Sequence, residues 1–213
     1  GWRKQIPVLA EAGFRVIVPD QRGYNLSDKP KGSRAYNLNE LTSDIVGLID
    51  ALEYEKVNLV GHDWGAVVAW TLGIRNPERL HRLSVMNVPH PAVMRRFLHR
   101  DLEQLRRSWY AILFQLPWNP ESGMRANNWR GAERALRGSG KIHTFTNEDI
   151  TKYKEAWSQP NAMTSMINWY RAALRHQPPT PKDPRVKVPT LMLWGMKDVA
   201  LTHRMARPSI DYC

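Results

Sequence analysis

The chain has 213 residues with a single cysteine, Cys213, so it is long enough for one domain with an insertion and has no internal disulfide framework. No apolar run reaches the ~18 residues of a membrane span, and together these features predict a cytoplasmic protein without membrane-spanning segments. The formal net charge is +11, and residues 95–185 carry 16 Lys and Arg against 8 Asp and Glu. This basic stretch contains no nucleic-acid-binding motif, so we interpret it as a solvated helical surface and predict no nucleic-acid partner.

Helix-like and strand-like segments alternate over the first 90 residues. Apolar side chains recur at helical spacing in three segments, which predicts helices over residues 2–12, 38–52 and 66–74. Short apolar runs predict strands over residues 14–18, 57–60 and 83–88. Asn37, with Glu40 three residues later, gives the second helix the pattern of a capping box. This order of elements predicts an α/β fold, in which helices cover both faces of a parallel sheet.

The pattern changes between Pro91 and Pro184, where helical stretches alternate with proline-rich connections and no strand is evident. The segment "VPTLMLWG", residues 188–195, then restores a strand. We therefore predict a core built from residues 1–90 and 186–213, with residues 91–185 inserted as a helical lid.

The segment "NLVGHDWGAVVAW", residues 58–70, has the strand–turn–helix frame of a nucleophile elbow, with Asp63 at the position that serine usually takes. A carboxylate is ionised near neutral pH, because its reference pKa is about 3.9, and it can attack a saturated carbon to form an alkyl ester. Release of that ester needs a base to activate water, an acid to orient the base, and an oxyanion hole. The structural alternative for Asp63 is a helix N-cap.

The motifs "GHDWG", "VPDQRGYNLSDKP" and "LWGMKD" resemble those of the soluble epoxide hydrolases of the α/β-hydrolase superfamily, and the resemblance covers essentially the whole chain. Haloalkane dehalogenases are near relatives that share "HDWG". The resemblance implies that Asp63 is the nucleophile, that the backbone N–H of Trp64 is an oxyanion donor, and that Asp198 orients a catalytic histidine. Asn87 stands where some dehalogenases place that acid. No cofactor or metal is expected.

The lid separates the two families, because an opening epoxide leaves an alkoxide that needs a proton donor. A phenol with a pKa of about 10 suits this task. The segments "SWYAILFQLP" and "NWYRA" resemble those that hold the tyrosine pair of epoxide hydrolases. The resemblance implies that Tyr110 and Tyr170 hold and protonate the epoxide oxygen. A halide would instead need an indole or amide donor, which Trp64 could supply. We expect hydrolysis of a small apolar epoxide; the alternatives are a haloalkane dehalogenase and a non-catalytic ligand-binding protein, and a homodimer is left open.

The sequence departs from the family pattern near both ends. The expected histidine after the last strand is missing, since the only later one, His203, follows Asp198 by five residues and should begin a helix. The family's HGxP segment, which carries a second oxyanion donor, would precede residue 1 and is absent. Its strand would lie between the strands at 14–18 and 57–60. We therefore expect a fold incomplete at both termini and a protein that is alkylated at Asp63 without turnover.

Overall fold

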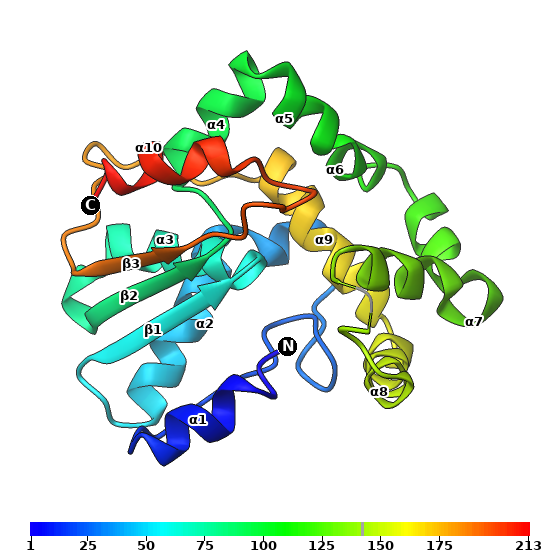
Figure 1. Cartoon of the computed structure of the whole chain (residues 1–213), viewed down its shortest axis with the longest axis horizontal. Coiled ribbons are helices and arrows are strands. Elements are labelled where there is room, and N and C mark those ends of the chain that lie inside the picture. The colour runs from blue at the N-terminus through cyan, green and yellow to red at the C-terminus, as the bar shows by residue number, and fades with distance from the viewer. Residues whose placement is uncertain (142) are drawn as a thin grey trace.

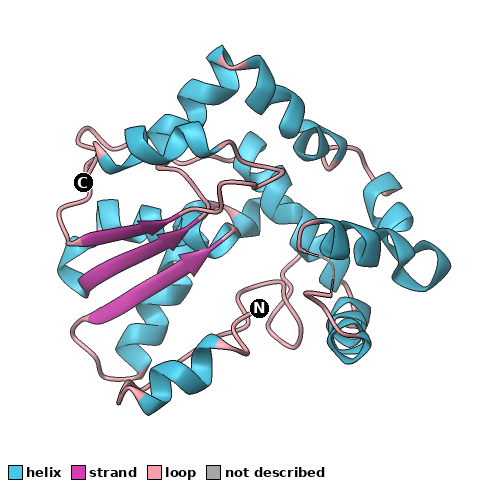
Figure 2. Cartoon of the chain, viewed as in Figure 1, coloured by secondary structure: helices cyan, strands magenta, loops and turns pink. Residues whose placement is uncertain are grey.

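The computed structural model describes residues 1–141 and 143–213, which form a parallel sheet with helices packed around it (Figures 1 and 2). The sheet has the order β1-β2-β3, with β1 (Val57–His62), β2 (Leu80–Met86) and β3 (Thr190–Leu193). Both pairings are parallel, and they align Gly61, Val85 and Met192 across the sheet. The predicted α/β fold class is therefore confirmed.

Four helices flank the strands in the sequence: α1 (Gln5–Glu11), α2 (Leu38–Ala51), α3 (Trp64–Arg75) and α10 (Ala206–Ile210). They are supplemented by the short turns η1 (Ser33–Tyr36), η2 (Pro77–Arg79) and η3 (His203–Met205). Helix α3 supplies the centre of the core, where the fully buried Trp70 packs with Leu83 and Val85 and donates its indole N–H to the Val88 carbonyl at 3.0 Å. The packing of α3 against the parallel strands β1 and β2 thus fixes the position of the loop between β1 and α3.

The predicted capping box of α2 forms only in part. The Asn37 side chain accepts the backbone N–H groups of Asn39 and Glu40, as the pattern predicts. The Asn37 N–H, however, donates to the Arg34 carbonyl, and Glu40 lies 3.5 Å from the guanidinium of Arg22. Glu40 therefore pairs with Arg22 in the tertiary structure and does not accept the Asn37 N–H as a capping box requires.

The helices of the predicted lid all lie between β2 and β3 in the sequence. They are α4 (Pro91–Arg100), α5 (Leu102–Arg107), α6 (Trp109–Leu113), α7 (Asn119–Gly138), α8 (Asn147–Ser158) and α9 (Ala162–Arg175). In Figure 1, α4 to α6 form one arm, α7 and α8 lie farthest from the sheet, and α9 returns toward the core. Trp169 and Ala172 of α9 pack into a buried cluster with Leu41 and Val68, which ties the lid to α2 and α3.

The predicted strand over residues 14–18 is not formed. These residues have no regular secondary structure, and the side chains of Phe14, Ile17 and Val18 are 54%, 42% and 45% exposed. A strand exists only through hydrogen bonds to a neighbour. In the described part of the chain, β1 pairs with β2 alone, so its outer edge offers this segment no adjoining partner. Local β propensity was not sufficient here.

Helix cover on both faces of the sheet was also predicted, and it is wrong for the described residues. Helix α3 covers one face, whereas Val60, Leu191 and Leu193 on the other are 41%, 54% and 47% exposed. All residues of α1 are exposed, because the segment that would carry this helix onto the sheet is not itself in the sheet.

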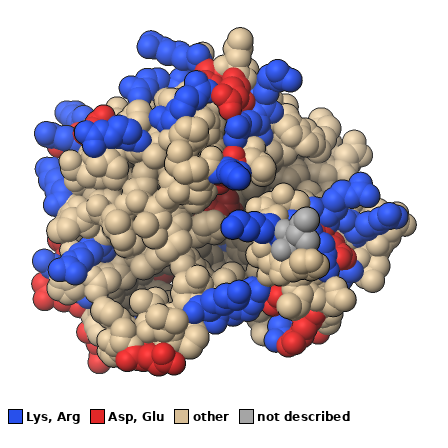
Figure 3. All heavy atoms as spheres, in the orientation of Figure 1, with Lys and Arg blue, Asp and Glu red and all other residues tan. Residues whose placement is uncertain are grey.

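The surface is strongly basic but not organised as one patch in the view of Figure 3, where Lys and Arg side chains are scattered around the visible face. Within residues 1–141 and 143–213, no helix combines the length and the apolar character needed to cross a membrane.

Candidate active site

The turn between β1 and α3 has the geometry of a nucleophile elbow. Asp63 has φ 52° and ψ −130°, a conformation that costs a non-glycine residue energy and commonly marks a functional turn. A Cβ added at Gly61 would lie 2.5 Å from the Gly65 carbonyl oxygen, so only glycine allows this close approach. The Asp63 side chain is exposed and, among the described residues, caps no N–H of α3. The structural alternative, an N-cap, is therefore wrong for this side chain.

Two lid tyrosines lie beside the elbow. Tyr110 on α6 and Tyr170 on α9 have ring centroids 5.9 Å apart, and the Trp64 ring lies 4.9 Å from that of Tyr170 in an edge-on arrangement. Burial, then the charges of Asp63 and Asp198, raises the pKa of Tyr110 to about 12. Burial, followed by the charge of Asp63, raises the pKa of Tyr170 well above 10. Both phenols therefore remain protonated at neutral pH and can act as hydrogen-bond donors.

Asp198 lies on the loop after β3. Its Oδ1 accepts the backbone N–H groups of Ala200 and Leu201, each at 2.8 Å, and its Oδ2 accepts the side-chain amide of Asn87. The carbonyl oxygen of the same amide accepts the Gly195 N–H at 3.0 Å. Asn87, at the end of β2, thus holds the carboxylate at the end of β3. Its supporting role could not be read from the sequence, because 111 residues separate the pair.

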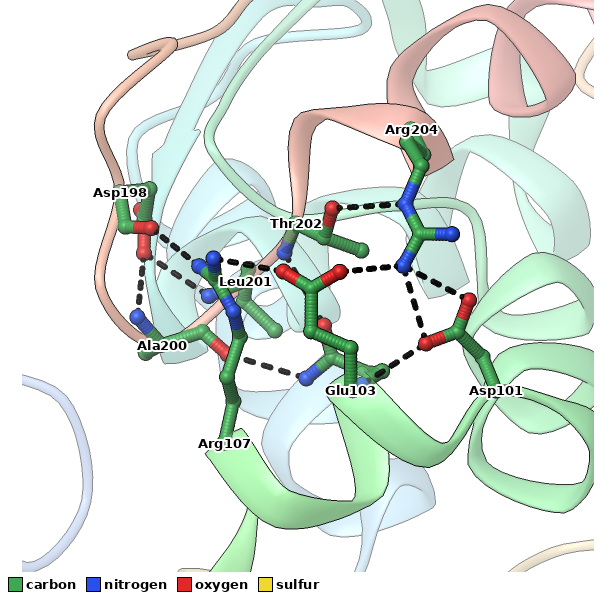
Figure 4. Close-up of polar contacts among 9 residues, drawn as sticks. Asp101, Glu103, Arg107, Asp198, Ala200, Leu201, Thr202 and Arg204 are labelled. Carbon is green, nitrogen blue, oxygen red and sulfur yellow. Dashed lines mark hydrogen bonds and ion pairs between the residues drawn. The ribbon is translucent and has the colours of Figure 1, made fainter.

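The loop of residues 198–202 after β3, here called the acid loop because it carries Asp198, is also held by contacts from α5 (Figure 4). Gln104 of α5 is fully buried; its amide donates to the Ala200 carbonyl at 2.9 Å and accepts the Thr202 N–H at 3.0 Å. Arg107 donates to the Asp198 carbonyl at 2.6 Å. Ion pairs join Arg204 beyond this loop to Asp101 and Glu103 at the start of α5. Polar side chains of α5 therefore bind the acid loop as well as facing solvent.

A third tyrosine, which the sequence analysis did not single out, lies near the elbow. The ring of Tyr24 is 5.4 Å from that of Trp169, and burial, then the charge of Asp63, raises its pKa. Its place in the turn-rich segment "QRGYNLSD" was the available signal, but turn composition says nothing about where an aromatic ring points.

The remaining predicted site features concern the backbone of Trp64 and the histidines. Trp64 is the first residue of α3, where backbone N–H groups lack intrahelical acceptors, and its oxyanion role stays a prediction. His203 begins η3 and is exposed, which confirms its expected position at a helix start. Among the described residues, the hydrogen bonds to Asp198 come from Asn87 and backbone groups, not from a histidine. These residues also include no cluster of His, Cys, Asp or Glu suited to a metal ion.

Comparison with known proteins agrees with the geometry. Residues 1–211 match the alpha/beta hydrolase fold family. The chain is 45% identical over its full length to the AB hydrolase superfamily protein YfhM of Bacillus subtilis, spanning 74% of it. It is 37% identical, again over its full length, to epoxide hydrolase 2 of Caenorhabditis elegans, spanning 61% of it. The chain thus spans about three-fifths to three-quarters of these relatives.

A solved structure extends this similarity to three dimensions. The crystal structure of an inhibitor-bound epoxide hydrolase from Bacillus megaterium superposes with a TM-score of 0.89 and 30% identity, covering 99% of this chain and 76% of that one. A family match over nearly the whole chain and epoxide hydrolase relatives in both sequence and structure lead to one assignment. The chain belongs to the epoxide hydrolase family of the α/β-hydrolase superfamily.

Proposed function

We propose that this chain opens a small apolar epoxide through an ester of Asp63, with Tyr110 and Tyr170 as the proton donors. One observation carries the proposal: the rings of Tyr110 and Tyr170 lie 5.9 Å apart, and the Tyr170 ring lies 4.9 Å from that of Trp64, the residue that follows Asp63 in the elbow. A halide leaves as a stable anion and takes no proton, whereas the oxygen of an opening epoxide becomes an alkoxide that needs both a hydrogen bond and a proton.

The ring-opening step balances with the groups present. An Asp63 carboxylate oxygen forms a bond to an epoxide carbon, and the carbon–oxygen bond of the ring breaks. The released oxygen takes a proton from Tyr110 or Tyr170, and the phenolate recovers a proton from water. This transfer is favourable even from a phenol whose pKa is about 12, because an alkoxide is the stronger base.

Hydrolysis of the ester would use Asp198 and Trp64. Asp198 is ready to orient a basic group, because Asn87 and two backbone N–H groups fix its carboxylate while Oδ2 retains a free lone pair. The N–H of Trp64 at the start of α3 would stabilise the tetrahedral oxyanion. Release of the vicinal diol would also need a base that activates water, and among the described residues no histidine is bonded to Asp198, so we expect the ester to persist.

Adduct formation tests the proposal directly. The protein is incubated with styrene oxide, its intact mass is recorded over time, and the adduct is located by peptide mapping. We expect a single adduct on Asp63, none in Asp63→Asn, and slower formation in Tyr110→Phe and Tyr170→Phe by about 10²-fold, the usual contribution of a general acid. An unmodified Asp63 after prolonged incubation, with no diol produced, would refute it.

A further inference from the structure

Arg171, the residue after Tyr170 on α9, is a buried arginine that reaches across to the end of α6. It is only 8% exposed. Its Nε donates to the Phe114 carbonyl at 3.0 Å and its Nη2 to the Leu116 carbonyl at 2.7 Å. The Phe114 carbonyl directly follows the last residue of α6, where helix carbonyls lack intrahelical N–H donors, and the Leu116 carbonyl lies two residues farther along the chain. The guanidinium therefore closes the C-terminal end of the helix that carries Tyr110.

Glu121 makes this burial of charge possible. It is 7% exposed and receives both ends of the guanidinium fork, at 2.7 Å and 3.2 Å. Exchange of a buried ion pair for apolar residues is often neutral for stability, so stability alone does not explain why such a pair is present. What distinguishes this pair is its directionality: one planar group fixes a carboxylate and two carbonyls at the same time.

Two further residues, Gln115 and Phe114, join the same segments. The Gln115 amide nitrogen lies 3.1 Å from the Tyr170 carbonyl and 3.1 Å from the Ala111 carbonyl, so it links α9 to α6. The Phe114 ring lies 6.0 Å from the ring of Tyr110 and 4.8 Å from that of Tyr170. The backbone that Arg171 holds thus carries the aromatic ring that touches both tyrosines.

We propose that Arg171, neutralised by Glu121, is a positioning residue that sets the separation of the Tyr110 and Tyr170 phenols so that both reach one epoxide oxygen. The inference rests on the proposed function. Helix α6 has five residues and little internal rigidity, so its register against α9 must come from such cross-helix bonds. A shift of about 1 Å in a catalytic group can cost on the order of 10²-fold in rate.

The test compares two electrophiles that differ in their need for a proton. Styrene oxide opens to an alkoxide and requires the tyrosines, whereas benzyl bromide alkylates the same carboxylate by losing bromide and requires no proton. Both rates of Asp63 alkylation are measured by intact mass and peptide mapping in the wild-type protein and in Arg171→Lys. Lysine keeps the charge opposite Glu121, but its ammonium cannot reproduce the planar fork. The matched control is Arg134→Lys, an exposed arginine on α7.

We expect Arg171→Lys to slow alkylation by styrene oxide about 10²-fold, to leave the benzyl bromide rate unchanged, and Arg134→Lys to change neither. Equal loss of both rates would show a merely structural role and overturn the inference, as would no change in either. If the lysine variant does not fold, Arg171→Met combined with Glu121→Met removes both charges together and must give the same split between electrophiles. Failure of the wild-type protein to react with styrene oxide would instead overturn the proposed function, and this inference with it.

Discussion

His90 joins the two ends of the predicted lid, and its titration should control stability between pH 7 and pH 5. The side chain is fully buried directly before α4. Its Nδ1 accepts the Ala92 N–H at 3.2 Å, and its Nε2 lies 2.9 Å from the Pro184 carbonyl. Only the neutral ring with its proton on Nε2 satisfies both contacts. The ring also stacks on Tyr212 at 4.3 Å. A second proton would remove the N-cap and place a charge in this apolar stack.

The magnitude follows from the pKa. Burial lowers the pKa of His90 from 6.5 to about 4, with the Pro184 hydrogen bond acting in the opposite direction. A folded-state pKa below the unfolded value gives stability that is present above pH 6.5 and is lost as the pH falls toward 4. Each pKa unit is equivalent to about 1.4 kcal/mol, so the free energy of unfolding should fall by about 2 kcal/mol between pH 7 and pH 5 from this residue alone.

The assay is urea denaturation followed by far-UV circular dichroism at pH 7, 6 and 5, for the wild-type protein, His90→Asn and the control His99→Asn. Asparagine can still cap α4 through its side-chain oxygen but does not titrate. We expect the wild-type protein and the exposed His99 control to lose about 2 kcal/mol more than His90→Asn over this range. The reasoning is refuted if all three proteins show the same dependence on pH.

Two further substitutions test the elbow and the acid loop. Gly61→Ala places a methyl group against the backbone of Gly65 and should prevent folding or cost more than about 3 kcal/mol, whereas Gly47→Ala in open space on α2 should stabilise by about 0.5–1 kcal/mol; thermal denaturation distinguishes them. Gln104→Glu keeps the acceptor for the Thr202 N–H but loses the donor to the Ala200 carbonyl, so it should cost about 1–3 kcal/mol in urea denaturation; wild-type stability would contradict a supporting role for this hydrogen bond.

Much of the core could be predicted from the sequence because its determinants are local. The Asn37 cap, the apolar stripe of α2 and the strand–turn–helix frame around Asp63 each depend on residues within a few positions of one another. The prediction of a strand at 14–18 was wrong for the opposite reason: its residues have β propensity, but in the described part of the chain no neighbouring strand pairs with them.

The sequence by itself predicted the chemistry at the elbow, since a carboxylate between two glycines after an apolar strand has the pattern of a nucleophile that attacks carbon. Tertiary structure alone decided how that carboxylate is surrounded. It placed Tyr110 and Tyr170 with their rings 5.9 Å apart, joined Arg171 to Glu121 across 50 residues, and joined Asn87 to Asp198 across 111. The physical reason is that buried polar groups must find partners in space, and those partners need not be near in the sequence.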